Sequence, residues 1–244
     1  MKLNTKDFKN YSNNGVIKVN NAFSNQEISH LKKKINFYIK NNKTKLKGKE
    51  INFVNKKINS IHLFRDKYFK KFSNQKKILG LGNFFLKSKP KVRHCEYFAK
   101  PKRIGLASPM HQDNYYWNLK DPNSFTMWIA IDKANKINGA VEYLVGSHKK
   151  IYKHVPSYAP GSSQKIQNLN DLKKKFKKKT YNLNPGDCLI HHSQIIHGSK
   201  KNTSNFSRRG FTIQLMTENT KIDIKKYKKY QNFLIKQIEL REKL

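Results

Sequence analysis

The sequence predicts a mainly β protein, a sandwich or jelly roll buttressed by helices, and three observations support this fold class. From residue 92 onward, short runs of strand-forming residues alternate with turn residues such as Gly, Pro and Asn. Before residue 92 the apolar spacing is mostly helical, and helices followed by many short strands are typical of such an architecture. The 244 residues show no internal repeat and no second domain, so we expect one domain over residues 1–244.

The N-terminal part, residues 24–90, is predicted to be largely helical after a short strand at residues 15–19. Ser24 and Glu27 have the spacing of a capping box, in which each side chain accepts from the other residue's backbone N–H. Apolar residues then recur at helical spacing through residue 39. The pattern further predicts a strand at residues 51–54 and helices at residues 58–72 and 75–86.

The predicted jelly-roll core covers residues 92–216 and consists of short strands separated by turns. We expect strands at residues 92–98, 110–116, 125–132, 140–145, 181–183, 188–191 and 210–216. A long polar connection, residues 147–179, separates the earlier strands from the later ones. Apolar residues at helical spacing over residues 222–243 predict a C-terminal helix.

The charge of the chain is strongly positive, with 52 Lys+Arg against 15 Asp+Glu and a formal net charge of +37. Such a field favours anionic partners, whether nucleic acid, a membrane surface or an anionic small molecule, although a solvated basic surface without a dedicated partner explains it equally well. The basic run at residues 172–179 could form a lid that attracts an anionic substrate. We interpret Glu142 as a salt-bridge partner within this basic protein and Lys100 as a surface lysine.

The two cysteines, Cys95 and Cys188, both lie in apolar runs of strand character. Two cysteines do not build a disulfide framework, so we expect buried, reduced thiols. The N-terminus lacks the apolar region of a secretory leader, and no apolar run has the length of a membrane span. These features predict a cytoplasmic protein.

A candidate metal site lies in residues 109–117, PMHQDNYYW, which place His111 and Asp113 two positions apart. On an extended strand these two side chains would point to the same face. His197 comes from a later stretch and could approach from another strand. Two imidazoles and one carboxylate on one face of a metal ion form the facial triad of non-haem Fe(II) oxygenases. Arg208, at the start of a further strand, could clamp a dicarboxylate through a bidentate pair.

The remaining histidines are weaker candidates for metal binding. His191 and His192 stand near His197, but the apparent turn after them breaks the strand alternation, so we do not expect them to contact the metal. We interpret His148 as a structural residue. His94 has no partner at the spacing of a structural zinc site.

Taken together, these motifs resemble the phytanoyl-CoA dioxygenase family of Fe(II)/2-oxoglutarate oxygenases, over roughly residues 12–216. Each motif alone is weak, and their order and spacing carry the resemblance. The matching pieces are His111-Gln112-Asp113, Trp128-Ile-Ala-Ile-Asp132, Asn138-Gly139, Gly146-Ser-His-Lys149, Pro185-Gly-Asp187, His197-Gly-Ser199, Asn202-Thr-Ser204 and Arg208-Arg209.

The resemblance implies a double-stranded β-helix, a cupin-like jelly roll, with His111, Asp113 and His197 as iron ligands. It also implies that Arg208 holds the distal carboxylate of 2-oxoglutarate, while strand alternation turns the adjacent Arg209 away. The positions that match residues lining the cosubstrate pocket of the family are Gln112, Trp128 and Ser199.

The activity implied is hydroxylation of a C–H bond of a small organic substrate, with Fe(II), 2-oxoglutarate and O2, and with release of succinate and CO2. In halogenating relatives a small residue replaces the carboxylate ligand, so the presence of Asp113 favours hydroxylation. The positive charge suggests an anionic substrate. Two alternatives stay open: a nucleic-acid or polyanion-binding protein on the same fold without turnover, and an oxygenase that acts on a macromolecule. Against the first, the aromatic residues are not arranged as a stacking platform for bases.

Overall fold

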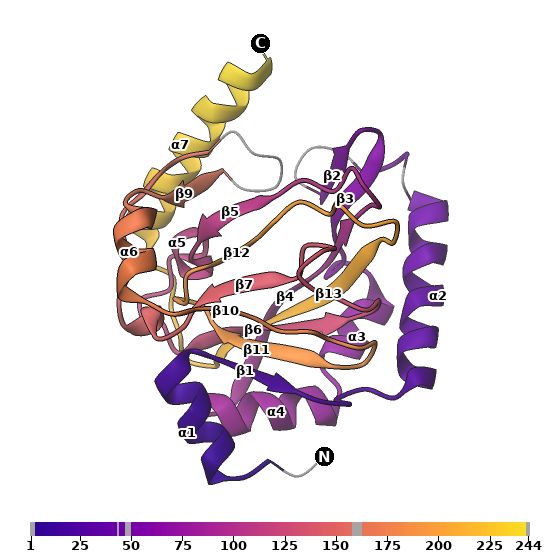
Figure 1. Cartoon of the computed structure of the whole chain (residues 1–244), viewed down its shortest axis with the longest axis horizontal. Coiled ribbons are helices and arrows are strands. Elements are labelled where there is room, and N and C mark those ends of the chain that lie inside the picture. Colours follow the sequence, from indigo (N-terminus) through magenta and orange to yellow (C-terminus); the bar gives the residue numbers. More distant parts are fainter. Residues whose placement is uncertain (1–2, 43, 47–49, 158–162, 243–244) are drawn as a thin grey trace.

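The computed structural model describes residues 3–42, 44–46, 50–157 and 163–242. Two antiparallel sheets form the core, as Figure 1 shows, and their arrangement confirms the predicted jelly roll. Within the described residues the larger sheet has the strand order β1 (Val16–Val19), β11 (Cys188–His192), β6 (Ser124–Ala130), β13 (Arg208–Thr217), β4 (Pro90–Lys100), β3 (Lys57–His62) and β2 (Ile51–Val54). The smaller sheet has the order β10 (Lys178–Thr180), β7 (Val141–Leu144), β12 (His197–Ser199) and β5 (Ser108–His111).

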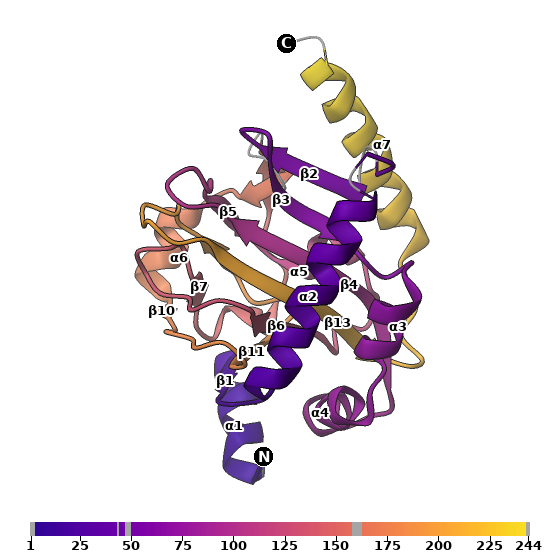
Figure 2. The same cartoon turned by 90° about the vertical axis from the view of Figure 1, so that its right-hand side faces the viewer.

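Helices cover the outer face of the larger sheet (Figure 2). They are α1 (Thr5–Asn14), α2 (Asn25–Asn42), α3 (Lys67–Ser73) and α4 (Lys76–Leu86). The capping box predicted before α2 is present, because Glu27 N donates to Ser24 Oγ at 3.2 Å and Ser24 N donates to the Glu27 carboxylate at 2.7 Å. The apolar stripe of α2 packs into the main hydrophobic core against the sheet. The helices therefore close one side of the sheet and leave its other face for the site.

The remaining elements connect the strands of the two sheets or follow the last strand. They are α5 (Asp113–Trp117), η2 (Ser147–Lys149), β8 (His154–Pro156), β9 (Gln164–Ile166), α6 (Leu169–Lys175) and α7 (Ile224–Glu242). The predicted C-terminal helix is confirmed as α7, which extends away from the sheets in Figures 1 and 2. In the described part of the chain, no helix combines the length and apolar character that crossing a membrane requires.

The predicted helix at residues 58–72 is wrong in its first half, where β3 forms a hairpin with β2. The turn between them places Asn55 and Lys56 at φ values of 47° and 61°. This left-handed pair suits a two-residue hairpin, but it lacks the glycine that normally signals one. The helix begins only at residue 67, where the Asp66 side chain accepts from the N–H groups of Tyr68 and Phe69.

Two further strand predictions need correction. The strand expected at residues 110–116 ends at His111, and residues 113–117 form the short helix α5. Residues 181–183 do not form the expected strand, and Leu183 makes only an isolated bridge with Ala134. The strand that pairs with β7 is β10, which lies just before them in the sequence. The polar connection before it contains β8, β9 and α6.

Candidate active site

The three predicted metal ligands come together at the inner side of the smaller sheet. His111 ends β5 and His197 begins β12, and the two residues are direct partners across this antiparallel pair. Asp113 is the first residue of α5. The expectation that His111 and Asp113 share one face of a continuous strand is therefore wrong. A helical turn brings the carboxylate back toward the imidazole.

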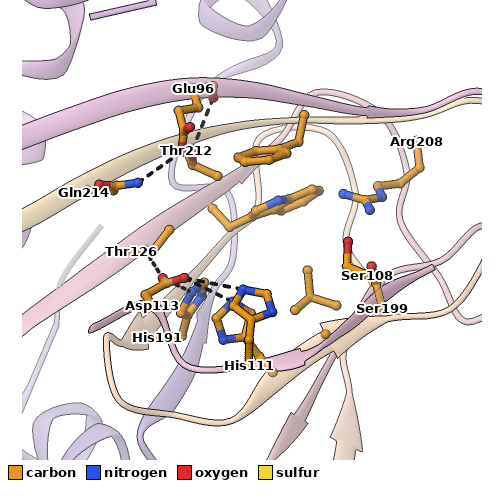
Figure 3. Close-up of a pocket in the computed structure, with 15 residues that line it drawn as sticks. Glu96, Ser108, His111, Asp113, Thr126, His191, Ser199, Arg208, Thr212 and Gln214 are labelled. Atoms are coloured by element: carbon orange, nitrogen blue, oxygen red, sulfur yellow. Dashed lines mark hydrogen bonds and ion pairs between the residues drawn. The ribbon is translucent and has the colours of Figure 1, made fainter. Parts of the chain in front are cut away.

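The donor atoms of these residues converge on one point. Nε2 of His111 and Nε2 of His197 lie 3.7 Å and 3.5 Å from Asp113 Oδ1. One donor atom from each of the three residues lies within 4.8 Å of the others, a spacing that can hold one metal ion. Figure 3 shows the imidazole of His111 and the carboxylate of Asp113 facing the same space.

The second nitrogen of each of these two imidazoles is held by the backbone. His111 Nδ1 lies 2.8 Å from the carbonyl oxygen of Pro109, and His197 Nδ1 lies 3.0 Å from that of Ile195. A carbonyl only accepts, so both Nδ1 atoms carry the proton and both Nε2 atoms present a lone pair to the metal position. The donor set and its tautomers fit a divalent ion with open coordination positions.

Thr126 and His191 hold the second oxygen of the Asp113 carboxylate. Thr126 Oγ1 donates to Asp113 Oδ2 at 2.7 Å, and His191 Nε2 lies 3.4 Å from the same oxygen. The other nitrogen of His191 is 3.0 Å from the hydroxyl of the buried Tyr143. The prediction that His191 does not contact the metal is consistent with its absence from the three converging donors, but its contact with Asp113 and that of Thr126 were not foreseen. Their proximity follows from the pairing of β11 with β6, in which His191 faces Thr126.

The electrostatics of the buried site favour metal-ready protonation states. Burial alone raises the pKa of Asp113, but the neighbouring imidazoles of His197, His111 and His191 outweigh it and hold this pKa well below the ordinary value. Burial lowers the pKa of His197 to about 3, so its imidazole is neutral at physiological pH. A neutral imidazole and an ionised carboxylate are the forms that bind metals.

A cavity of about 140 Å³ extends from the metal position to Arg208. Figure 3 places Arg208 with Ser108 and Ser199 at one end and Asp113 at the other. The guanidinium of Arg208 stacks 5.2 Å from the ring centre of Trp128, and its buried Nε has no hydrogen-bond partner. Burial lowers the pKa of Arg208 to about 10, which still leaves it charged at neutral pH. A buried cation that lines a cavity and has an unpaired donor is suited to receive a carboxylate.

Strand alternation separates the two neighbouring arginines as expected. Arg209 points to the other side, where its Nη2 donates to Asp132 Oδ1 at 2.7 Å. Gly210, the next residue, leaves space for the Trp128 ring, which forms part of the cavity wall. A Cβ at this position would lie only 2.1 Å from that ring.

The predicted cosubstrate residues do not all reach this cavity. Trp128 and Ser199 line it. Gln112 does not belong to the described residues that line it, since its amide is bound elsewhere: its Nε2 donates to the carbonyl of Lys150 at 2.8 Å and its Oε1 accepts from Tyr152 N at 2.8 Å. Gln112 thus ties the loop after β7 to the turn that carries His111 and Asp113.

Of the other residues considered from the sequence, Lys100 requires a correction. It is 4% exposed, and its Nζ donates to the carbonyl oxygens of Lys200, at 2.7 Å, and of Leu106. Burial lowers the pKa of Lys100 to about 6. The interpretation as a surface lysine is therefore wrong.

The other expectations for single residues have mixed outcomes. Glu142 lies 3.9 Å from Lys178, as a salt bridge requires, and both cysteines are buried free thiols. His148 contacts the carbonyl of Ser12 at 3.0 Å, which fits a structural role. His94 does have partners, because His62 and Glu96 complete a second cluster that could hold a metal. Spacing alone could not show this cluster, since His62 belongs to another strand.

A second hollow, of about 560 Å³, continues outward from the metal position. Both hollows are lined by Glu96, Phe98, His111, Asp113 and Gln214. The outer hollow adds residues from β3, α5 and α7, including His62, Tyr116 and Tyr230. The basic run at residues 172–179 contributes none of the described residues that line either hollow, so the structure does not support its role as a lid.

The model of the phytanoyl-CoA dioxygenase (PhyH) family matches residues 11–210 of the chain. The chain belongs to this family. Among curated PhyH relatives, a phytanoyl-CoA dioxygenase domain-containing protein 1 homolog of Caenorhabditis briggsae is 29% identical over 170 residues, which cover 67% of this chain and 59% of the relative. The phytanoyl-CoA dioxygenase 1 of Oryza sativa subsp. japonica is 28% identical over 171 residues, covering 67% and 57%. The chain thus spans about three-fifths of the length of these relatives.

Solved structures confirm the fold at low sequence identity. EctD from S. alaskensis, crystallised with 2-oxoglutarate and 5-hydroxyectoine, superposes with a TM-score of 0.76 at 16% identity and covers 91% of this chain and 78% of that one. The carbocyclase SnoK from nogalamycin biosynthesis, described as non-haem and α-ketoglutarate-dependent, gives a TM-score of 0.75 at 17% identity and covers 91% and 87%. The PhyH match ends at residue 210, so α7, which contributes Tyr230 to the outer hollow, lies outside it.

Proposed function

We propose that this PhyH-family protein is an Fe(II)- and 2-oxoglutarate-dependent dioxygenase that hydroxylates a C–H bond of a small organic molecule and releases succinate and CO2. One observation carries the proposal: two imidazoles and a carboxylate converge at one end of a cavity whose other end holds a buried arginine with an unpaired Nε. A metal at the first end and a dicarboxylate spanning to the second would satisfy both sets of groups.

Each of these residues has a distinct task. His111, Asp113 and His197 would hold Fe(II), which when bound supplies the activation of O2. Arg208 binds the distal carboxylate of 2-oxoglutarate, and the Trp128 ring keeps the guanidinium in place from one side. Ser199 and Ser108, neighbours across the β12–β5 pair, offer hydroxyls at the same end of the cavity.

The residues behind the ligands keep the site in one arrangement. The bond from Thr126 fixes one carboxylate oxygen of Asp113 and leaves the other for the metal. Since Asp113 occupies the third ligand position, no place opens for a halide, which favours hydroxylation over halogenation. The buried, reduced cysteines fit a reducing compartment such as the cytoplasm.

The test is iron-dependent formation of succinate from 2-oxoglutarate in air, measured without added substrate and then with small-molecule pools. We expect a slow basal rate that requires Fe(II) and is lost in Asp113→Ala. Asp171→Ala, which removes an exposed carboxylate of α6, serves as the matched control and should retain the rate. No iron-dependent succinate from the intact protein would contradict the proposal and would favour a polyanion-binding role, for which the net charge of +37 is the support.

A further inference from the structure

The outer hollow contains a polar wall that the proposed chemistry does not use. Its members are connected by hydrogen bonds and line the hollow: Arg93, His94, Glu96, His62 and Gln214. Since the outer hollow shares Asp113 and His111 with the metal-side cavity, a molecule bound there lies beside the reacting centre.

A β-bulge turns Arg93 into this hollow. In the pairing of β13 with β4, Gln214 faces His94 but Leu215 faces Val92, so Arg93 is an extra residue on its strand. Val92 and Cys95 both belong to the hydrophobic core, which leaves Arg93 and His94 together on the cavity side. Regular alternation would have placed these neighbours on opposite faces. Bulges commonly redirect side chains next to active sites.

Arg93 is held in place but lacks an acidic partner. Its guanidinium lies 5.1 Å from the ring centre of Trp117, and its Nη1 donates to the side-chain oxygen of Gln214 at 2.5 Å. Within the described part of the chain, no carboxylate forms an ion pair with Arg93. Burial lowers the pKa of Arg93, and the negative charges of Glu96 and Asp113 offset this only in part.

The nearest carboxylate, Glu96, is already committed. Its Oε1 lies 2.8 Å from His62 Nδ1, and its Oε2 accepts from Gln214 Nε2 at 3.0 Å. Burial lowers the pKa of His62, but the bond with Glu96 outweighs it and the net pKa is raised, which favours a matched pair of charges. His62 Nδ1 also lies 2.7 Å from His94 Nε2, so its single proton is shared between Glu96 and His94.

We propose that Arg93 binds an anionic head group of the substrate, a carboxylate or a phosphate, and thereby holds the substrate in the outer hollow beside the metal. This rests on the proposed function and specifies its substrate as a small organic anion. With the metal and cosubstrate bound, Asp113 and 2-oxoglutarate would carry three negative charges, which Fe(II) and Arg208 would balance. Glu96 is matched by His62. Arg93 therefore remains as the cation available to the substrate, through the planar donor fork that suits such oxyanions.

The rest of the hollow suits the carbon skeleton of a small molecule. Its volume of about 560 Å³ lies within the range of small-molecule sites. Phe98, Tyr116 and Ile222 offer apolar surface. Tyr230 of α7 contacts the rings of Tyr115 and Tyr116, at centroid distances of 6.2 Å and 5.7 Å, and so helps to close one side.

The test uses inorganic phosphate and acetate as probes of protein loaded with Mn(II) and saturating 2-oxoglutarate. An anion at Arg93 lies close to the paramagnetic ion, so the relaxation of phosphate ³¹P and acetate ¹H should be enhanced. Anions bound to the basic surface are too far away to contribute. We expect enhancement in the intact protein, loss of about tenfold or more in apparent affinity in Arg93→Gln, and partial retention in Arg93→Lys. The probe whose enhancement saturates at the lower concentration, and therefore binds more tightly, identifies the head group.

Arg65→Gln is the matched control, since it removes the same charge from a side chain that is 89% exposed, and it should behave as the intact protein. Equal enhancement in Arg93→Gln and the intact protein, or none in either, would overturn the proposal. Crystals soaked separately in phosphate and in acetate decide it independently, because density for either anion at Arg93 supports the proposal and empty density there in both contradicts it. Failure of the proposed function would appear separately, as absence of iron-dependent succinate formation.

Discussion

Replacing Arg208 by lysine tests how this protein would bind 2-oxoglutarate. Arg208 is 3% exposed and lines the cavity, its guanidinium packs on Trp128, and its buried Nε has no hydrogen-bond partner. Lysine keeps the positive charge but cannot form the two parallel hydrogen bonds of an arginine–carboxylate pair. Losing one hydrogen bond to a charged group costs about 1.5–3 kcal/mol, which corresponds to a dissociation constant about 10–150-fold larger.

The assay is an anaerobic titration of the Fe(II) protein with 2-oxoglutarate, followed by its visible charge-transfer band. Arg209→Lys is the matched control, because Arg209 pairs with Asp132 on the opposite face and its replacement should leave the affinity unchanged. Fe(II) binding and thermal unfolding of Arg208→Lys show whether the variant is folded. An unchanged affinity in folded Arg208→Lys, or an equal loss in Arg209→Lys, would refute the assignment.

Three further outcomes follow from contacts around the site. Thr126→Val removes the 2.7 Å bond to the metal-binding carboxylate and should weaken iron affinity about 10–100-fold, measured by metal titration; unchanged affinity would contradict this role. Gly210→Ala forces a Cβ into the Trp128 ring and should lower the free energy of unfolding by about 1–3 kcal/mol. Gly80→Ala, which has open space around it in α4, should instead raise this free energy by up to about 1 kcal/mol. Urea denaturation measures both, and equal effects of the two substitutions would count against a clash at Gly210. The Nδ1 of His192 accepts from Gln194 N at 3.0 Å, and burial lowers the pKa of His192 to about 3. The unfolded chain therefore binds the extra proton, and the free energy of unfolding should fall by up to about 1.4 kcal/mol per pH unit as the pH drops from about 6.5 toward 3. Unfolding curves across this range should show a smaller slope for His192→Gln, and an identical slope would contradict the assignment.

The three residues that the sequence nominated as metal ligands do come together in the structure, but the local structure around them differs from the prediction. His111 and His197 meet because β5 and β12 pair in register, which the strand pattern made plausible. Asp113 reaches the same point from a helical turn, and no periodicity over five residues could have shown this. Motif identity was therefore a better guide than the geometric argument attached to it.

The parts that sequence reasoning missed all depend on contacts between distant segments. His191 and Thr126 meet through the pairing of β11 with β6. Nothing in the residues around Lys100 indicates that its side chain is buried. The burial is explained by the carbonyl oxygens of Leu106 and Lys200, which accept hydrogen bonds from its Nζ. The bulge at Arg93 changes which residues share a face, and its only trace in the sequence is that Val92 and Cys95, three positions apart, are both apolar. Alternation arguments fail at such positions because the bulge shifts the phase of the strand.

The most direct test of the whole account is the visible spectrum of the protein after anaerobic addition of Fe(II) and then 2-oxoglutarate. The converging donors of His111, Asp113 and His197 and the buried Arg208 predict a weak metal-to-ligand charge-transfer band that appears only when both components are present. Asp113→Ala should abolish it. If the intact, iron-loaded protein gives no such band, the metal and the cosubstrate do not assemble on these residues, and the proposed dioxygenase activity is wrong.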